Sequence, residues 1–496
     1  MQNTNTWDNY DEKRLKECDD FCDGYMDFLS TCKTERECVR HIVTDIEKEG
    51  YVSLDSKRKG GDSLKAGDKI YAVNMNKAVV MFNIGSEPLE NGINILGAHI
   101  DSPRMDIKQN PLYEEGGFAY LDTHYYGGIK KYQWVALPLA LHGVVVKKDG
   151  SSVEIVIGEK ETDPVFFVSD LLIHLAQEQM EKRASKVIEG EALDIIVGNR
   201  TLKIDGCGKG GEKTADIAGR ENQGDCGTST EEKDENCAKK TPVKAGILKI
   251  LKDRYGMDED DFMSAELEVV PAGAAREAGL DGSMILSYGQ DDRVCAYTSY
   301  KAMMEVPDVS RTACCILVDK EEIGSVGATG MQSRFFENVL AEIIALSGDY
   351  SELTLKRTLS ASTMLSSDVS SAFDPTYKSS FDSKNVAYLG NGMVFNKFTG
   401  ARGKAGSNDA NAEYLAHLRA ILDEDGVNFQ TAELGRVDLG GGGTIAYILA
   451  LYGMNVIDSG VAVLNMHAPW EATSKADVYE TKRGYVTFLN KAKRIV

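Results

Sequence analysis

The sequence predicts an α/β fold in which a β-rich insertion interrupts a domain of alternating strands and helices. Short apolar runs alternate with helical patterns in the first and last parts of the chain, and polar residues follow several of these runs. Residues 105–262 lack this alternation. We therefore expect residues 1–104 plus 263–496 to form one domain and residues 105–262 to form a second, inserted domain.

The first domain is expected to begin with helices, because apolar residues recur at helical spacing between residues 10 and 50. Three strands follow, and the third leads into His99-Ile100-Asp101. These strands are expected at residues 70–73, 78–84 and 93–98. After the insertion, the expected strands are residues 313–318, 358–365 and 460–466, and the expected helices are residues 294–304, 334–347, 410–422 and 444–452.

The inserted domain is expected to be rich in strands. Residues 144–150 and 153–157 have a hairpin pattern, and residues 171–180 suggest a short helix. Residues 204–242 are rich in Gly, Lys, Glu and Asp and almost free of large apolar side chains. Such a segment cannot bury enough apolar surface to offset its ordering entropy, so we expect a mobile surface loop there.

The composition excludes several classes of protein. The chain has 496 residues and a formal net charge of -21, which repels nucleic acid and anionic membranes. No apolar run approaches the roughly 18 residues that a transmembrane helix needs. The N-terminal residues carry no signal-peptide pattern, and the ten cysteines include no Cys-x-x-Cys pair. We therefore expect a cytoplasmic protein with reduced thiols.

Five polar positions share one setting in a single expected sheet, the end of a strand or the turn that follows it. They are His99, Asp291, the pair Glu321-Glu322, Asp368 and His467. Together they supply two imidazoles and four carboxylates, a set that fits two zinc ions with one bridging carboxylate and one left over as a base. The adjacent glutamates point in different directions, which suits one as a ligand and the other as the base. Four other histidines are expected to be structural: His41, His124, His142 and His417.

Six sequence runs resemble the M18 family of aminopeptidases, the aspartyl aminopeptidase family. The runs are GAHIDSP, GQDDRVCA, DKEEIGS, SSDVSSAFDP, GSNDANAEY and VLNMHAPWE, and the resemblance covers nearly the whole chain. It implies a zinc-peptidase (phosphorylase/hydrolase-like) three-layer αβα domain with an inserted β-rich dimerisation domain. It also implies peptide substrates and a homo-oligomer built from dimers, commonly a dodecamer.

The resemblance further implies two Zn²⁺ ions per subunit, with Co²⁺ or Mn²⁺ as substitutes. Asp291 would bridge the two ions, with the neighbouring Asp292 as the alternative. Glu321 would be the general base, and Asp101 would orient His99. The implied ligands of one zinc are His99 and Asp368, and those of the other are Glu322 and His467.

Assembly depends on features of the insertion. Many relatives have a histidine there that reaches a neighbouring subunit, whereas this chain has Asp170 at that position and His174 at a different one. The intersubunit role is therefore left without its usual residue. Four aromatic residues are candidates for an apolar dimer contact or for the insertion's own core: Tyr125, Tyr126, Tyr132 and Trp134.

Substrate preference is the remaining question. The family name implies an N-terminal Asp or Glu, which needs a cation in the pocket, and the candidates are Lys397 and Arg402. The alternative is that both are solvated loop cations. Other functions to consider are an aminopeptidase for neutral N-terminal residues, a di-zinc amidohydrolase acting on acylamino acids, and a non-catalytic assembly protein.

Overall fold

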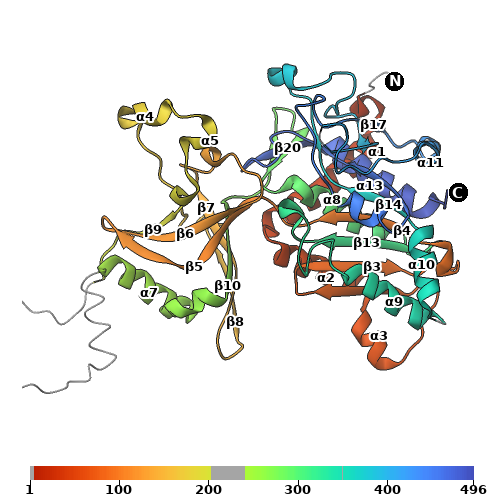
Figure 1. The fold of residues 1–496 in the computed structure, drawn as a ribbon, viewed down its shortest axis with the longest axis horizontal. Helices are drawn as coiled ribbons and strands as arrows, with labels where there is room; N and C mark the ends of the chain where they lie inside the picture. Colours follow the sequence, from red (N-terminus) through yellow and green to blue (C-terminus); the bar gives the residue numbers. More distant parts are fainter. Residues whose placement is uncertain (1–4, 203–240, 349, 401, 496) are drawn as a thin grey trace, which may run out of the picture. The chain divides into compact units, whose positions relative to one another are not determined.

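The computed structural model describes residues 5–202, 241–348, 350–400 and 402–495 (Figure 1). The loop expected at residues 204–242 therefore lies almost entirely outside the described residues. Contacts divide the chain into two units, each described here by itself. Unit 1 comprises Met1–Arg104, Tyr126–Lys130 and Gly273–Val496, and unit 2 comprises Met105–Tyr125 and Lys131–Ala272.

Unit 1 is built on a nine-stranded sheet with a parallel centre. The central strands, in spatial order, are β13 (Ala313–Val318), β4 (Asn94–His99), β14 (Thr363–Ser367) and β18 (Asn455–Gly460). Their carboxyl ends meet at one edge, where open α/β sheets carry their sites. The outer strands are β1 (Val52–Ser53), β2 (Lys69–Asn74) and β3 (Ala78–Asn83) beyond β13, and β16 (Met393–Asn396) and β17 (Phe429–Thr431) beyond β18.

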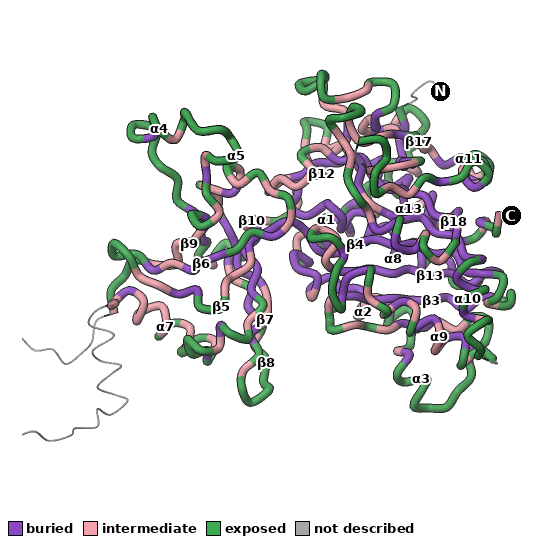
Figure 2. The backbone as a smooth tube through the Cα atoms, viewed as in Figure 1, coloured by how far each residue is buried: buried purple, intermediate pink, exposed green. Residues whose placement is uncertain are grey.

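Helices cover both faces of this sheet, so the expected three-layer αβα architecture is confirmed. Alternate side chains of β13 enter different cores: Cys315 and Leu317 pack in one, Cys314 and Ile316 in the other. Figure 2 shows that the central strands β4 and β13 are buried. The first core includes α1 (Glu12–Thr31), α2 (Glu35–Lys48), α8 (Gln290–Glu305), α11 (Ala412–Glu424) and α13 (Lys475–Lys491). The second includes α3 (Leu54–Gly60), α9 (Phe335–Ser347), α10 (Glu352–Ala361) and α12 (Ala446–Ala450).

Two small sheets complete unit 1. One contains β11 (Arg276–Ala278), β12 (Met284–Ser287) and β20 (Glu471–Ser474), and the other contains β15 (Ser370–Ser371) and β19 (Ala462–Val463). Among the helices of the described residues, none is both long and apolar enough to cross a membrane.

Two expected strands are shifted along the chain. The strand expected at residues 358–365 begins at Thr363, as β14, because the residues up to Ala361 belong to α10, whose Ser351 cap accepts a hydrogen bond from the backbone N–H of Thr354. Within residues 461–466 only Ala462–Val463 form a strand, β19, and the strand of the nine-stranded sheet lies earlier, as β18. Its buried polar residues Asp458 and Ser459 conceal the strand from a hydrophobic pattern.

Unit 2 holds a six-stranded sheet in the order β8-β7-β10-β5-β6-β9. The expected hairpin is present, since β7 and β8 pair antiparallel with Val145 opposite Val153. β10 pairs with β7, so unit 2 extends to Ala272, past the domain end expected at residue 262. The elements are β5 (Arg104–Glu115), β6 (Phe118–Tyr126), β7 (Leu139–Val146), β8 (Ser152–Ile157), β9 (Ile195–Gly198), β10 (Ala265–Pro271), α4 (Gln177–Met180), α5 (Ala184–Val187) and α7 (Pro242–Tyr255).

The four aromatic candidates for a dimer contact differ in exposure. Trp134 is fully buried within the chain, and Tyr126 is only 8% exposed and belongs to unit 1. Neither can supply an exposed apolar surface. Tyr125 and Tyr132 are 41% and 42% exposed and remain available.

Gly460, the last residue of β18, packs closely against the carboxyl end of β14. A Cβ atom there would lie 2.0 Å from the backbone oxygen of Asp368 and 2.9 Å from Cys295 Sγ. We expect Gly460→Ala to lower the midpoint of thermal unfolding, followed by circular dichroism, by about 2 °C or more, because the strand must move to relieve the overlap. Gly348→Ala is the control, since a Cβ atom at Gly348 meets nothing within 4 Å. Equal midpoints would show that β14 accommodates the methyl group.

Candidate metal centre

Three of the polar positions lie at the carboxyl edge of the central strands. His99 is the last residue of β4, Glu321 and Glu322 follow β13, and Asp368 follows β14. Parallel pairing produces this arrangement, because parallel neighbours end at the same level. The register places Val318, the last residue of β13, directly opposite His99.

The other two positions come from outside the nine-stranded sheet, which corrects the expectation that all five follow strands of one sheet. Asp291 lies near the start of α8, after β12, and His467 lies in the turn between β19 and β20. These strands belong to the two small sheets. A sequence pattern marks where a strand ends but not which sheet the strand joins.

Asp291 lies between the two histidines. His99 Nε2 is 3.2 Å from Asp291 Oδ1, and His467 Nε2 is 3.2 Å from Asp291 Oδ2. Two ligands of a tetrahedral zinc ion, with bonds of roughly 2.0–2.1 Å, lie about 3.3 Å apart. Each imidazole therefore faces its own oxygen of one carboxylate at the separation expected for ligands of a shared ion.

Further carboxylates complete two groups of potential ligands. Asp368 Oδ1 is 3.9 Å from His99 Nε2, and Glu322 Oε1 is 3.5 Å from His467 Nε2. Asp292, next to Asp291 in sequence, groups with His99 and Asp368, and the ligand atoms of these three residues lie within 4.8 Å of one another. Each histidine is thus surrounded by carboxylates from different segments of the chain.

The donor atoms present fit metal ions. His99 Nε2, Asp291 Oδ1, Glu322 Oε1 and both carboxylate oxygens of Asp292 are buried without a hydrogen-bond partner. Burying polar atoms in this way is costly unless something else binds them. Imidazole nitrogen and carboxylate oxygen are donors that zinc accepts. Bound cations would therefore satisfy these buried polar atoms.

Glu321 differs from its neighbour in its electrostatics and its position. Its Oε2 atom lies 4.0 Å from His99 Nε2, farther than the Asp291 carboxylate. The pKa of the Glu321 carboxyl is raised to about 7. Burial is the main cause, the charges of Asp291 and Asp101 add to it, and the charge of His99 opposes it. A carboxyl group that titrates near neutral pH can both accept and release a proton.

Asp101 connects His99 to the two glutamates. It is fully buried, and His99 Nδ1 lies 3.0 Å from its backbone oxygen and 3.3 Å from its Oδ1 atom. Its carboxylate accepts hydrogen bonds of 3.2 Å from the backbone N–H groups of Glu321 and Glu322. The Tyr126 hydroxyl donates a further bond of 2.8 Å. Burial alone would raise the pKa of Asp101, but the proton and charge of His99, together with Tyr126, outweigh burial and lower the pKa.

Glu471 is part of the site that sequence reasoning missed. Its carboxylate accepts hydrogen bonds from the backbone N–H of His467 at 2.7 Å and from that of Asp291 at 3.0 Å. It therefore joins two segments that are far apart in the sequence. One sequence feature could have identified Glu471: it lies four residues after His467, where the turn that contains the histidine leads into a strand.

Lys397 and Arg402 are the candidate cations for substrate binding. Both lie on the loop after β16, and both are exposed. Within the described parts of the chain, neither side chain bonds to a candidate ligand. The residue before Lys397, Asn396, is buried, and its side-chain amide lies 3.4 Å from Ser370 Oγ.

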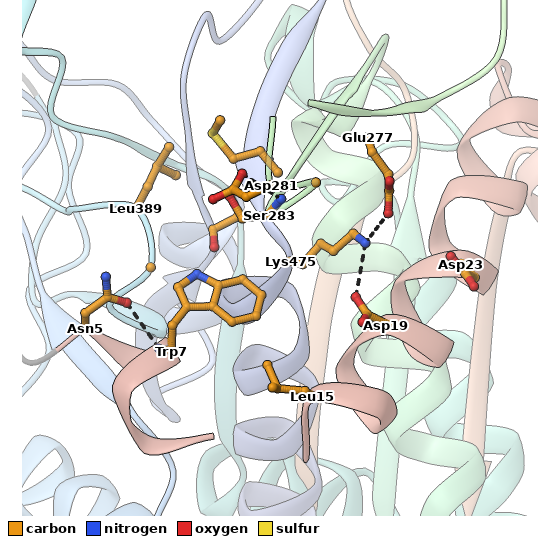
Figure 3. Close-up of a pocket in the computed structure, with 14 residues that line it drawn as sticks. Asn5, Trp7, Leu15, Asp19, Asp23, Glu277, Asp281, Ser283, Leu389 and Lys475 are labelled. Atoms are coloured by element: carbon orange, nitrogen blue, oxygen red, sulfur yellow. Dashed lines mark hydrogen bonds and ion pairs between the residues drawn. The ribbon is translucent and has the colours of Figure 1, made fainter. Parts of the chain in front are cut away.

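A separate cavity of about 790 Å³ lies elsewhere in unit 1 (Figure 3). Lys475 lies between Asp19 and Glu277, with its ammonium nitrogen 3.1 Å from Asp19 Oδ1. Asp23 and Asp281 add two further carboxylates to the lining. The residues around this cavity, all of them described, include no candidate ligand, so the cavity and the metal centre are distinct.

We expect Asp101→Asn to weaken metal binding about 10- to 100-fold, because partners that orient ligating groups have effects of this size. An asparagine amide keeps one acceptor oxygen, so the hydrogen bonds that the other carboxylate oxygen accepts would be lost. Competition with a chromogenic zinc chelator measures the change. Asp319→Asn is the control: Asp319 is a buried aspartate whose carboxylate accepts a hydrogen bond from Thr329. Equal zinc affinities in the two variants would contradict an orienting role for Asp101.

Comparisons with known proteins identify the family. Residues 28–489 match the family model described as Aminopeptidase I zinc metalloprotease (M18). A probable M18 family aminopeptidase 1 from Clostridium acetobutylicum is 58% identical over 486 residues, which cover 98% of each chain. Crystal structures of aminopeptidase I from C. acetobutylicum (54% identity, TM-score 0.86) and of an M18 aminopeptidase from Thermotoga maritima (41%, 0.87) align over 99% of this chain and 100% of theirs. The mApe1 dodecamer of S. cerevisiae shares the fold at 18% identity and a TM-score of 0.70, over 95% of each chain. The chain therefore belongs to the M18 family of zinc metalloproteases and is an aminopeptidase of that family.

Proposed function

We propose that this aminopeptidase uses two zinc ions to remove the N-terminal residue from peptides, and that Asp291 is shared between the ions. The observation that supports two ions is the position of Asp291 between two imidazoles, each 3.2 Å from a different oxygen. His99 and Asp368 would hold one ion, and Glu322 and His467 the other. When bound, the ions polarise the scissile carbonyl and lower the pKa of water. Co²⁺ and Mn²⁺ accept the same donor atoms and are the proposed substitutes.

Glu321 is the proposed general base. Its carboxyl, on a side chain that is 15% exposed, has a pKa of about 7 and lies beside the ligands. In this role it takes a proton from the attacking water and delivers it to the leaving amine. Asp101 is the proposed positioning residue, because it contacts the ring of His99 and the backbone of both glutamates.

The adjacent glutamates offer a matched pair of variants that tests this proposal. We expect Glu321→Gln to lower kcat by at least about a hundredfold, in line with the loss of a general base, while leaving the zinc content near normal. Glu322→Gln should lose zinc together with activity, because it removes a proposed ligand. Metal analysis of both purified variants separates the two roles. Zinc loss from Glu321→Gln would make Glu321 a ligand and leave the reaction without its proposed base.

Two competing functions make different demands on the substrate. A di-zinc amidohydrolase needs no free α-amino group, whereas an aminopeptidase does. Rates for a free aminoacyl substrate and for its N-acetylated form therefore distinguish the two activities, and we expect only the free form to be cleaved. A non-catalytic assembly protein would cleave neither. Against that function, Glu321 and all five proposed ligands are present.

Preference for an N-terminal Asp or Glu is a further part of the proposal. Such a preference needs a cation that can reach the substrate carboxylate, and Lys397 and Arg402 are the proposed cations. Both lie on the exposed loop that follows β16.

A preference for neutral residues is the second candidate, and one observation favours it. Asn396, not Lys397, is the residue buried beside Ser370, two positions after Asp368. An uncharged amide at this position gives no electrostatic preference for an acidic side chain. An acidic preference predicts faster cleavage of an aspartyl substrate than of a leucyl substrate, and a neutral preference predicts the reverse.

Replacing Lys397 tests the acidic preference. We expect Lys397→Ala to lower kcat/KM for an aspartyl substrate at least about tenfold relative to a leucyl substrate, because a charge-assisted contact is worth about 1.5–3 kcal/mol. Lys404→Ala is the control, since that lysine lies on the same loop and pairs with Asp409 at 2.8 Å. An unchanged ratio of the two rates in Lys397→Ala would favour the neutral preference.

We also propose that the protein is a homo-oligomer, a dodecamer built from dimers, with unit 2 making the dimer contact. Exposed apolar residues on unit 2 support this assembly, and they include Leu172, Ile173, Leu175 and Met180, each more than half exposed. The mApe1 dodecamer supports the subunit number by analogy of fold. Light scattering at moderate salt tests the proposal, and a monomer mass near 54 kDa would contradict it.

A further inference from the structure

The segment Tyr126–Lys130 belongs to unit 1, although the chain on both sides of it belongs to unit 2. Tyr126 is the last residue of β6, and Gly127 and Gly128 follow it. Tyr126 and Gly128 each contact a residue of the candidate metal centre, and a side chain at Gly127 would meet a third. Sequence reasoning did not identify any of them as site residues.

Tyr126 contacts Asp101. Its hydroxyl donates a hydrogen bond of 2.8 Å to Asp101 Oδ2, and the guanidinium of Arg104 lies 4.0 Å from the centre of its ring. The phenol is therefore held by its ring and by its hydroxyl. The other carboxylate oxygen of Asp101 lies 3.3 Å from His99 Nδ1, so the position of Tyr126 bears on the orientation of His99.

Gly128 contacts His467. Its carbonyl oxygen lies 2.9 Å from His467 Nδ1. A carbonyl oxygen can only accept a hydrogen bond, so Nδ1 carries the proton and Nε2 is left free, the form in which imidazole binds zinc. The His467 side chain is 34% exposed, whereas that of His99 is 1% exposed. Because packing holds His467 less firmly, the contact with Gly128 matters more for its orientation.

Gly127 leaves room for Glu322. A Cβ atom at Gly127 would lie 3.3 Å from both Cβ and Oε2 of Glu322, and 3.4 Å from Cβ of Pro103. The backbone at Gly127 also has a φ of +75°, an angle that residues other than glycine rarely adopt. A side chain at this position would therefore press on a proposed zinc ligand.

We propose that Tyr126-Gly127-Gly128 is a positioning segment for the metal centre. Gly128 sets the tautomer and direction of His467, Gly127 leaves the space that Glu322 occupies, and Tyr126 fixes Asp101. The inference rests on the proposed two-zinc function. The proposed ligands of the second zinc are Glu322 and His467. In this proposal their orientation depends chiefly on the backbone of Gly127 and Gly128, which lie far from both ligands in the sequence.

A matched pair of glycine variants tests this role. Gly127→Ala and Gly117→Ala add the same methyl group at φ values of +75° and +82°, but a Cβ atom at Gly117 meets nothing within 4 Å. Zinc affinity is measured on the purified full chain by competition with a chromogenic chelator. We expect Gly127→Ala to bind one zinc normally and the second at least about tenfold more weakly, and Gly117→Ala to bind both normally. Two zinc ions bound with unchanged affinity by Gly127→Ala would overturn the inference.

Two further variants make the result decisive. If Gly127→Ala does not fold, Tyr126→Phe decides instead, because it keeps the ring beside Arg104 and removes only the hydroxyl. We expect it to weaken zinc binding severalfold, and an unchanged affinity would overturn the inference. His467→Ala tests the underlying proposal and should lose one zinc. If His467→Ala keeps both ions, the assignment of His467 as a ligand fails, and an unaltered chain that binds only one zinc would contradict the two-zinc proposal. If His467→Ala loses one while Gly127→Ala and Tyr126→Phe keep both, only the positioning role fails.

Discussion

Repulsion among buried carboxylates is the constraint on which the site depends. Seven carboxyl groups surround two imidazoles: Asp101, Asp291, Asp292, Glu321, Glu322, Asp368 and Glu471. Burial, together with the charge of neighbouring aspartates, raises the pKa of Glu322 and Asp368 well above the ordinary range. So much negative charge cannot stay buried without compensation. Divalent cations would supply that compensation, so the proposed ligands would also make folding and metal binding interdependent.

Backbone N–H groups supply a second form of compensation. Asp101 accepts hydrogen bonds from the N–H groups of residues 321 and 322, and Glu471 accepts them from those of residues 291 and 467. Neither carboxylate is a proposed ligand. Each instead joins chain segments that are distant in sequence, so the negative charge that makes the site costly also holds its parts together. This explains why the ligands keep their geometry although they come from three separate sheets.

The sequence predicted those parts of the fold and site that depend on local patterns. Hydrophobic runs located β4 and β13, and the residues after them proved to lie at one edge of the sheet. Local patterns failed where long-range contacts decide the structure. Asp458 and Ser459 are buried in β18 despite their polarity, and Glu471 gains its partners only when β20 pairs with β12. The contacts of Tyr126, Gly127 and Gly128 arise only because a segment between two parts of unit 2 returns to unit 1.

The spread of the proposed ligands along the chain has a consequence for biosynthesis. His99 is translated first among them and His467 last, with the other proposed ligands between the two. At about 5–20 residues per second, roughly 20–70 s pass between the translation of these two histidines. A growing chain would therefore carry an incomplete centre throughout that interval. With the proposed ligands, peptide cleavage would have to wait until His467 has been translated.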